Sequence, residues 1–532
     1  MAVGRAQRKP AGLNTPVPRE RRGPYDAAVV GFGPTGAVLA NLLGLCGLRV
    51  VVLEREAEIY RLPRAVHFDG EVMRIFQTIG VADRVAAVSR VNAGMRFVDP
   101  DGRLILDWPR PQQVGPQGWH PSYRFHQPDL EAILRDRLHT MPNVDVLMGA
   151  DAMSIDQGQQ LATVTYREDQ RQHTLAASYV VGCDGARSLV RERITDRAED
   201  LGFHERWLVV DLLLRKDRPV LGDFTIQYCH PQAPATYVRG PGRRRRWEIS
   251  IGDLPDTHAL ARRHIWHRLA RWLTPSDADV ERAAVYTFHS VIASSWRRGR
   301  LLIAGDAAHQ SPPFMGQGMC AGIRDAANLA WKLALCIRHG HDDALLDSYQ
   351  SERHPHVRAF IKRAVDLGRL VNASDSEAAL KSAFRQPDGS YRMTTIAPRL
   401  GPGLWQSDCP AAGHISRQLH LKEGGRSDGL VGYATSLLVD GSLLARWEGR
   451  ADAVKKGIHV WQSAELHGVA GYLAELGTRA VSIRPDRYVH GTANAPATLD
   501  ALVKDLPPIR ASASRWRTCP TGEVATCAPG SV

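Results

Sequence analysis

The chain has 532 residues, of which 44% are hydrophobic and 23% are charged, the balance of an ordinary globular protein. This composition excludes overall disorder, and the length predicts two or three domains with room to bury a large cofactor. The formal net charge of +12 is concentrated partly in the first 24 residues and in the run Arg243–Arg246. Because such runs are usually solvated tails or faces, we expect no nucleic-acid partner.

The eight cysteines form no CxxC pair and show no metal-ligand spacing. Free thiols in a reducing, cytoplasmic setting are therefore expected, and a metal site is not. The N-terminus lacks the apolar core of a signal peptide. Residues 27–48 form an uncharged stretch as long as a membrane span, but five glycines and one proline favour a strand, a turn and a helix instead. No membrane attachment is predicted.

Apolar periodicity divides the first 200 residues into a basic arm and an α/β unit. Residues 1–24 are predicted to be a disordered arm. Residues 25–200 form the first part of a nucleotide-binding domain. Its predicted elements are strands at 27–30, 50–53, 144–148, 161–166 and 179–182 and helices at 37–45 and 127–139.

The pattern changes to short strands after residue 200. A separate sheet module for the substrate is predicted over 201–295, with strands at 207–214, 224–228, 246–251 and 284–288 and a helix near 261–273. The strand 301–304 and the long apolar helix 318–338 then return the chain to the first domain, 296–375. A mixed linker near 370–400 leads to a further αβ region at 400–510, with strands at 436–439 and 480–484, and to a loose tail at 511–532.

The segment Gly31–Gly36, GFGPTG, follows a strand and opens a helix, which is the context that a dinucleotide-binding turn requires. Gly31 permits the tight turn, Gly33 lets the backbone approach a pyrophosphate, and Gly36 lets helix and strand pack closely. The helix N-terminus offers free N–H groups to the phosphates. Glu54, at the end of the second strand, is placed to accept hydrogen bonds from a ribose. FAD and NAD remain equally open at this point.

Two later motifs favour FAD. In the first, VVGCDGARS at 180–188, a strand ends in an Asp184-Gly185 turn before a basic helix start. The second, LLIAGDAAHQSPPFMGQG at 301–318, delivers Gly305 and Asp306 to a turn and continues through two prolines to Gly316 and Gly318 before a long helix.

In this order and spacing, the three motifs resemble those of the single-component FAD aromatic hydroxylases related to para-hydroxybenzoate hydroxylase. Within that family the motif sequences are most similar to those of 3-(3-hydroxyphenyl)propionate hydroxylase and of the polyketide hydroxylases. Further matching segments are LPRA at 62–65, FHQP at 125–128, RDA at 324–326, NLAWKL at 328–333 and RPDRY at 484–488. The resemblance spans about 25–505 and is weakest over the substrate module. It implies an α/β Rossmann-like FAD domain with an inserted α+β module and a C-terminal thioredoxin-like domain.

The resemblance also assigns roles to residues. Glu54 would hold the adenosine ribose and Arg64 the pyrophosphate, while Gln127 and Asp306 would bind the ribityl chain. Asp184 and Gly185 would serve FAD and the transient nicotinamide, and the N–H groups of Gly318 and Met319 would face the flavin N1 and C2 carbonyl. The full set of candidate cofactor-binding residues is Gly31, Gly33, Pro34, Thr35, Gly36, Glu54, Arg55, Arg64, Gln127, Asp184, Gly185, Gly305, Asp306, Pro313, Gly316, Gly318 and Met319.

The implied reaction is hydroxylation of a phenolic ring, with 3-(3-hydroxyphenyl)propanoate or a related hydroxylated aromatic acid as the expected substrate. NADH or NADPH would reduce FAD, and O2 would add to it as a C4a-hydroperoxide that transfers OH. No protein nucleophile is needed, and no catalytic side chain is firmly assigned. Candidates for drawing the phenolic proton are Tyr228, Tyr237, His230 and His289, with Arg243–Arg246 as a carboxylate anchor and Pro313 and Phe314 beside the ring.

Structural roles for these residues and other functions for the chain are the alternative interpretations. Strand aromatics and surface arginines are more often core or solvated than functional, and His309 is expected to be a structural turn residue. Cys409 precedes Pro410 without a second cysteine, so the C-terminal region is expected to pack or to pair subunits into a homodimer rather than to do redox chemistry. The rivals are a polyketide- or antibiotic-tailoring hydroxylase, a non-enzymatic FAD-fold binding protein, a flavin halogenase and a membrane-bound epoxidase.

Overall fold

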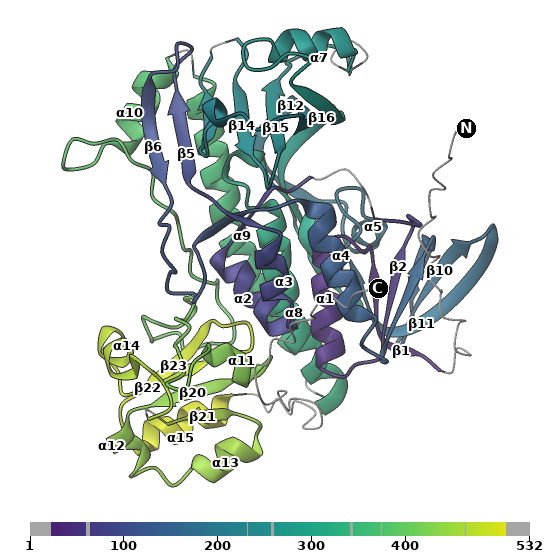
Figure 1. Cartoon of the computed structure of the whole chain (residues 1–532). Coiled ribbons are helices and arrows are strands. Elements are labelled where there is room, and N and C mark those ends of the chain that lie inside the picture. The colour runs from purple at the N-terminus through teal and green to yellow at the C-terminus, as the bar shows by residue number, and fades with distance from the viewer. Residues whose placement is uncertain are drawn as a thin grey trace, which may run out of the picture.

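The computed structural model describes residues 23–59, 64–230, 232–256, 260–340, 344–373, 375–462 and 464–506. All but the last two residues of the expected basic arm, and the whole expected tail, lie outside these ranges. Figure 1 shows three groups of strands gathered around a central set of helices. The six cysteines within the described residues all carry free thiols. None of the described helices is both long enough and hydrophobic enough to span a membrane.

The first sheet positions the cofactor motifs. Its path is β17 (Arg297–Arg298), β18 (Leu301–Ile303), β11 (Arg171–Gly182), β1 (Tyr25–Val30), β2 (Val50–Glu54) and β8 (Val144–Met148), and β10 (Ala162–Glu168) and β9 (Asp151–Gln157) extend it as antiparallel strands. β18, β11, β1, β2 and β8 are parallel, and Val30 is in register with both Leu53 and Gly182. The carboxyl ends of β1, β2, β11 and β18 therefore meet at one edge, where ligands of open α/β sheets bind.

Helices cover this sheet, and they meet where small residues allow it. α1 (Pro34–Leu45), α4 (Gln127–Leu138) and α8 (Gly318–His339) lie beside one another (Figure 1), and α1 packs directly against α8. A Cβ on Gly322 of α8 would lie 2.3 Å from Oγ1 of Thr35, so a glycine is required for the two helices to approach this closely. Ala27 to Val29 of β1 are fully buried, as expected for a parallel strand covered on both faces.

The second sheet is larger than the predicted module 201–295. Its order is β19 (His309–Gln310), β16 (Ala278–Ala293), β12 (Ala198–Leu214), β15 (Arg244–Ser250), β14 (Ala235–Arg239), β13 (Thr225–Tyr228), β5 (Gly94–Val98) and β6 (Leu104–Pro109). The hairpin β5–β6 comes from the segment that we assigned to the first domain. It joins because β5 pairs in parallel with β13, a long-range pairing that local sequence does not reveal.

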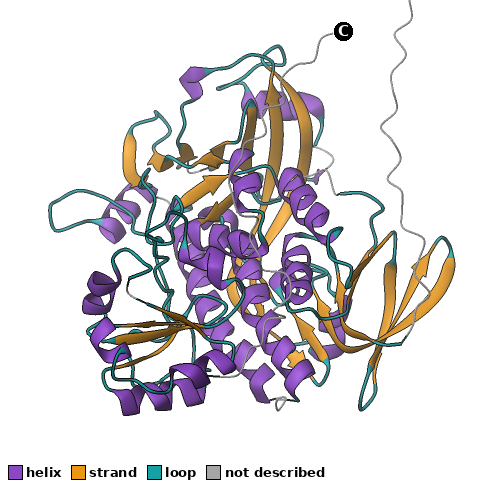
Figure 2. Ribbon diagram, turned by 60° about the horizontal axis from the view of Figure 1, so that its bottom comes forward, coloured by secondary structure: helices purple, strands orange, loops and turns teal. Residues whose placement is uncertain are grey.

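One face of the second sheet builds a core of its own with α7 (Arg262–Leu269). Alternate residues of the strands, such as Leu208, Tyr237 and Trp247, enter this core together with Ile265 and Leu269. The sheet also contacts the first domain, where α9 (Ala344–Val371) packs against β12 and β16. Figure 2 shows this sheet and the first sheet as separate layers with helices between them.

The remaining elements link these two sheets. A small sheet of β3 (His67–Asp69), β7 (Ser122–Arg124) and β4 (Arg90–Val91) lies beside α2 (Gly70–Ile79) and α3 (Ala82–Ala87), and α5 (Leu189–Ile194) follows β11. The long helix α9 (Ala344–Val371) packs on α8. The segment 370–400, expected to be a linker, contains α10 (Ser376–Phe384), whose Leu380 and Phe384 are buried in the main core.

The C-terminal region forms a separate four-stranded sheet. Its order is β21 (His459–Trp461), β20 (Ser436–Val439), β22 (Ala480–Ile483) and β23 (Val489–Ala493), with helices α11 (Ser427–Val431), α12 (Gly441–Leu444), α13 (Arg450–Lys455), α14 (Val469–Glu475) and α15 (Pro496–Asp505) around it. β20 runs parallel to β21 and antiparallel to β22. The thioredoxin-like assignment of this region stays a prediction.

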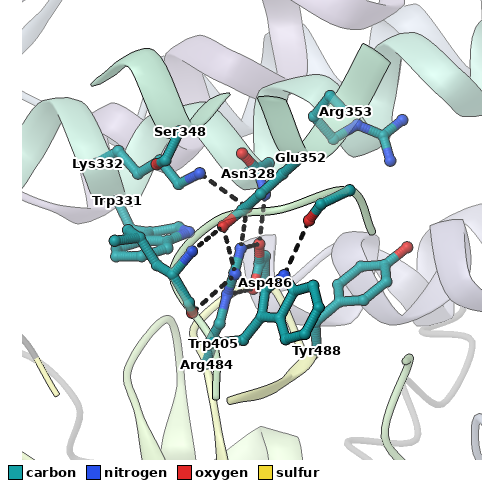
Figure 3. Close-up of polar contacts among 12 residues, drawn as sticks. Asn328, Trp331, Lys332, Ser348, Glu352, Arg353, Trp405, Arg484, Asp486 and Tyr488 are labelled. Carbon is teal, nitrogen blue, oxygen red and sulfur yellow. Dashed lines mark hydrogen bonds and ion pairs between the residues drawn. The ribbon is translucent and has the colours of Figure 1, made fainter. Parts of the chain in front are cut away.

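A buried charge network, which we call the α9 junction, joins this C-terminal region to α8 and α9. It consists of Asn328 and Lys332 of α8, Glu352 of α9, and Arg484 and Asp486, which follow β22; Figure 3 shows their side chains pointing toward one another. The Glu352 carboxylate lies 2.8 Å from Nζ of Lys332 and 2.7 Å from Nη2 of Arg484. Two cations and two carboxylates balance in charge, and all four are nearly inaccessible to solvent.

Candidate FAD site and substrate cavity

The glycine turn after β1 has the close contacts that its sequence requires. Gly31 has a φ of +98°, and a Cβ there would lie 2.5 Å from the carbonyl oxygen of Cys183. A Cβ on Gly36 would lie 2.0 Å from the carbonyl oxygen of Gly31. A Cβ on Gly33, in contrast, would meet no atom within 4 Å. The turn is therefore tight on the protein side and open above Gly33, where a pyrophosphate would lie.

Glu54 lies against this turn at the end of β2. Its Oε2 accepts a hydrogen bond of 2.8 Å from the N–H of Phe32, and its Oε1 accepts one of 3.0 Å from the N–H of Glu56. These contacts orient the carboxylate while each oxygen keeps a lone pair for a ribose hydroxyl. Arg55 points elsewhere: it is largely exposed and pairs with Glu56 at 3.4 Å.

The second and third motifs converge on the same turn. Asp184 is within 2.9 Å of the Cβ position of Gly31, and the Cβ position of Gly305, whose φ is +64°, lies 2.7 Å from Oγ1 of Thr35. Three stretches more than 100 residues apart in sequence thus form one edge, as the motifs predicted.

Two aspartates at this edge have oxygen atoms available to a ligand. Oδ2 of Asp184 accepts from the N–H groups of Leu189 and Val190, whereas its buried Oδ1 has no hydrogen-bond partner among the described residues. The side chain of Asp306 is accessible even though protein surrounds it closely, which is typical of a residue lining a recess. Desolvation raises the pKa of both carboxyl groups. An orphaned buried acceptor beside an open glycine turn fits a hydroxyl-bearing dinucleotide such as FAD.

Asp325 of α8 fixes the turn that carries Gly305 and Asp306. Its Oδ2 accepts from the N–H of Gly305 at 3.1 Å and from Nε2 of His309 at 2.6 Å, and its Oδ1 accepts from Nε of Arg353 at 2.9 Å. Burial opposes ionisation, but the His309 and Arg353 side chains hold the pKa of Asp325 below its usual range. His309 is buried and bonded to Asp325, which agrees with the structural role expected for it.

The N-terminus of α8 follows the Gly316–Gly318 segment, and His67 braces this segment. Gly316 has a φ of +62°, and its carbonyl oxygen lies 3.2 Å from Nδ1 of His67, while Nε2 of His67 lies 2.8 Å from Oγ of Ser122. The carbonyl can only accept, so Nδ1 carries a proton. Burial lowers the pKa of His67 to about 3, aided by Arg124 and Arg110. Gly318 has open space at its Cβ position, as a surface for a flat ring requires.

Gln127 and Arg246 both hold the backbone at Arg64. Oε1 of Gln127 accepts from the N–H groups of Arg64 and Ala65, each at 2.8 Å, and Nε2 donates to Glu131. Nη1 of Arg246 donates to the carbonyl oxygen of Arg64 at 2.8 Å. Residues 62 and 63 of the LPRA segment lie outside the described residues. Gln127 thus has a positioning role besides the ribityl contact predicted for it, which stays a prediction.

A cavity of about 570 Å³, including its mouth, lies between the Gly316 segment and the second sheet. Pro313, Phe314 and Gly316 border one side, as expected of residues near the reacting ring. The other lining residues are Val66, His67, Asn92, Gly94, Met95, Trp108, Arg110, Arg124, Thr225, Thr236, Val238, Glu248 and Met315. Phe314 packs edge-on against Phe203 and Trp207, so this wall is rigid.

The structure does not bring the predicted proton-drawing residues into this cavity. Tyr237 and Tyr228 lie on β14 and β13 but point into the core under α7. Strand side chains alternate, so residues of the opposite parity, Thr236 and Thr225, take the cavity face. His289 contacts His204 near the surface, with 2.8 Å between their Nδ1 atoms, and His230 accepts from the N–H of Gln232 in a turn.

The arginine run 243–246 is not a substrate anchor either. Arg246 is buried and bonded to Asp211 at 2.6 Å and 3.1 Å, and Arg245 is buried and donates to the carbonyl oxygens of Gly242 and Arg244. Nη1 of Arg243 donates to the carbonyl oxygen of Arg215, and Arg244 pairs with Glu281 at 3.6 Å. Their local density in the sequence suggested one surface, but each arginine has a separate protein partner.

Arg110, Arg124 and Glu248 line the cavity and were missed. Arg124 ends β7 directly before the Phe125–Pro128 motif, and Glu248 lies on β15 two residues after the arginine run. The signal for Arg124 was its position next to a cofactor motif. Arg110 and Glu248 reach the cavity only through long-range strand pairing, which single-sequence patterns do not carry.

Comparison with known proteins decides the family. The sequence profile of a family described as "FAD binding domain" matches residues 24–364. The chain belongs to this FAD-binding family. It is 36% identical over 518 residues to "Probable NADH-specific resorcinol 4-hydroxylase" of Rhodococcus jostii (strain RHA1), which covers 92% of this chain and 96% of that protein. It is 37% identical over 348 residues to "3-(3-hydroxy-phenyl)propionate/3-hydroxycinnamic acid hydroxylase" of Burkholderia cenocepacia (strain HI2424), covering 65% of this chain and 63% of the relative.

Solved structures of other proteins share the architecture. The flavin-dependent monooxygenase PieE, solved with FAD and substrate, superposes with a TM-score of 0.78 at 20% identity and covers 91% of this chain and 98% of its own. p-Nitrophenol 4-monooxygenase PnpA from Pseudomonas putida DLL-E4 gives a TM-score of 0.61 at 26% identity over 67% of this chain and 92% of its own. Together with the named relatives, these matches confirm the predicted fold class, the FAD cofactor and the class of FAD-dependent aromatic hydroxylase.

Proposed function

We propose that this chain is an NADH- and FAD-dependent monooxygenase that hydroxylates a small phenolic ring, either a dihydroxybenzene such as resorcinol or a hydroxyphenyl-alkanoic acid. The observation that carries the proposal is the convergence of Gly33, Asp184 and Asp306 on one open edge beside a cavity bordered by Pro313 and Gly316. The similarity over 92% of this chain to the protein named "Probable NADH-specific resorcinol 4-hydroxylase" supports both the ring size and the nicotinamide. A polyketide- or antibiotic-tailoring reaction is the alternative; the solved aklavinone-11 hydroxylase with FAD and aklavinone, at 21% identity, is similar to this chain in fold alone.

The residues at the sheet edge would bind and orient the cofactor. The open N-terminus of α1 above Gly33 would receive the pyrophosphate, and Glu54 would accept from the adenosine ribose. The orphaned Oδ1 of Asp184 and the accessible carboxylate of Asp306 would accept from further hydroxyl groups. When bound, FAD supplies hydride acceptance and oxygen activation.

The cavity residues would orient the substrate and handle its proton. Pro313 and Phe314 exclude water from the ring, which protects a reactive oxygen species from solvent. Glu248 is the carboxylate that lines the cavity, and burial raises its pKa. Its carboxylate would therefore take up the phenolic proton more readily than an ordinary glutamate, leaving a phenolate that reacts better with an electrophilic oxygen.

The test is substrate-dependent turnover of the purified protein. After reconstitution with FAD, NADH oxidation should rise at least about tenfold with resorcinol or 3-(3-hydroxyphenyl)propanoate, and the product should gain one oxygen atom by mass. Hydrogen peroxide is measured in parallel, because uncoupled oxidation also consumes NADH. A protein that retains no flavin, or that forms only peroxide with every phenol tested, would refute the proposal. Subunit pairing and a cytoplasmic location stay predictions.

A further inference from the structure

The substrate cavity has an excess of positive charge. Its charged lining residues are Arg110, Arg124 and Glu248, since burial and the two neighbouring arginines lower the pKa of His67 to about 3 and keep its ring neutral. Two guanidinium groups thus face one carboxylate within the described lining. An uncompensated buried charge is unfavourable, so a cavity of this composition favours an occupant that carries negative charge.

Arg124 is the better placed of the two arginines. It is only 9% exposed, and Nη2 donates to Oγ1 of Thr225 on the wall formed by β13. Its Nε is buried and has no hydrogen-bond partner among the described residues. For a guanidinium N–H on a cavity wall, a planar anionic oxygen group is the partner that suits it best.

Arg110 reinforces this side of the cavity. Its guanidinium lies 4.0 Å from the centroid of the Trp108 ring and donates to Oγ1 of Thr395, and the carboxylate that acts on it is Asp69, which is bonded to Arg324. Burial lowers the pKa of Arg110 and of Arg124 to about 10 each, which leaves both charged at neutral pH.

The neighbouring carboxylates are mostly committed to other cations. Asp69 lies 2.6 Å from Nη2 of Arg324, and Asp211 is bonded to Arg246. Glu248 lies 3.6 Å from Nη1 of Arg246, which draws it away from exclusive pairing with Arg124. The charges around Arg124 therefore do not cancel without a ligand.

We propose that Arg124, supported by Arg110, is the specificity-determining anion site of the cavity, and that the substrate binds with an anionic oxygen against the Arg124 guanidinium. This rests on the proposed function and names its substrate class: a phenol that ionises on binding, or an aromatic ring that carries a carboxylate. Neutral aromatic rings without an acidic group are poor ligands for this cavity.

The experiment measures binding to the oxidised FAD-loaded protein without NADH, so it does not depend on turnover. 4-Nitrophenol is the probe for a phenolate, because its ionised form absorbs visible light and its neutral form does not. The pH at which the bound probe ionises should fall at least about one unit below that of the free probe. Arg124→Met should abolish this shift and Arg124→Lys should keep most of it. Arg96→Gln is the matched control, since Arg96 pairs with Asp107 and stacks on Phe224.

3-Phenylpropanoate, which has a carboxylate and no phenol, tests the second source of the anion. If the carboxylate occupies the site, Arg124→Met should weaken its binding by about tenfold or more and leave the nitrophenol shift unchanged. Either result supports the anion site and identifies its source. The idea is overturned if the bound nitrophenol ionises like the free probe and 3-phenylpropanoate binds equally to wild type and Arg124→Met. Should Arg124→Met lose FAD, Arg124→Lys and Arg110→Gln carry the comparison.

Discussion

Neutralising Glu352 should uncouple the C-terminal region from the rest of the chain. The Glu352 carboxylate accepts hydrogen bonds of 2.7–2.8 Å from Asn328, Lys332, Arg484 and the N–H of Leu404. Glu352→Gln keeps the shape of the side chain and removes one of the two negative charges in the α9 junction. Lys332 and Arg484 would then share only Asp486, and the junction would hold an uncompensated positive charge.

The expected cost is about 3–5 kcal/mol, because removing one partner of a buried ion pair leaves a charge that water cannot reach. The carboxylates and cations of the junction are at most 2% exposed, so solvent screening gives no discount. Asp366→Asn on the same helix is the matched control. Asp366 pairs with Lys362 at 2.8 Å, but both are well exposed, and its loss should cost less than about 1 kcal/mol.

The pH dependence gives a second, independent check. Burial lowers the pKa of Lys332 to about 8, against the opposing influence of Glu352. Between this value and the unfolded pKa, the unfolded chain binds more protons, so this lysine contributes stability that rises with pH. In Glu352→Gln the supporting carboxylate is gone and the pKa of Lys332 falls further. At pH 9 the lysine is then neutral, and the defect should be smaller than at pH 6 by about 1 kcal/mol or more.

Urea unfolding of the FAD-loaded protein, followed by tryptophan fluorescence, measures this effect, since Trp331 and Trp405 lie next to the junction. The free energy of unfolding comes from linear extrapolation at pH 6 and pH 9. The reasoning fails if Glu352→Gln loses no more stability than Asp366→Asn, or if its loss is the same at both pH values.

Three further predictions concern the sites. Gly36→Ala should prevent FAD retention and destabilise the fold, whereas Gly33→Ala should leave the apoprotein's stability unchanged and weaken FAD binding alone. Flavin absorbance measures the bound FAD, and thermal unfolding measures the stability. Gly471→Ala is the control, because the Cβ position of Gly471 has open space. Asp325→Asn should lower FAD occupancy and cost about 3–5 kcal/mol, since it leaves Arg353 buried without its carboxylate; unchanged occupancy would contradict the role of this anchor. Tyr237→Phe and His289→Gln should change kcat/KM less than about twofold, because neither side chain reaches the cavity, and a tenfold loss in either would show that the cavity has been misplaced.

The nucleotide-binding half could be predicted closely because its signals are local. The strand 144–148 and the helix starting at Gly318 lie where hydrophobic runs and glycines placed them. Gly31, Asp184 and Gly305 each follow a buried parallel strand, so their convergence follows from sheet geometry once the strands are recognised.

The substrate side could not be predicted in the same way. Which residues of β13 and β14 face the cavity depends on strand parity, and a shift of one residue exchanges Thr236 for Tyr237. A sequence pattern favours aromatic side chains as functional candidates, but here these were the ones required for the core under α7. Arg110 reaches the cavity only because β5 pairs with β13, and this pairing joins segments more than 100 residues apart.

The interleaving of the second sheet limits how this enzyme can be re-engineered. Its strands come from 94–109, 198–293 and 309–310, and the first sheet takes its own strands from between and around these stretches. A chimera that exchanges only 198–293 with a relative would graft foreign strands onto a native hairpin and lose the match between β13 and β5. Transferring the substrate preference of a relative therefore requires exchanging at least the hairpin 94–109 and the segment 198–293 together. The hydrogen bond from Arg246 to the carbonyl oxygen of Arg64, which connects the exchanged segment to the rest of the chain, must be retained.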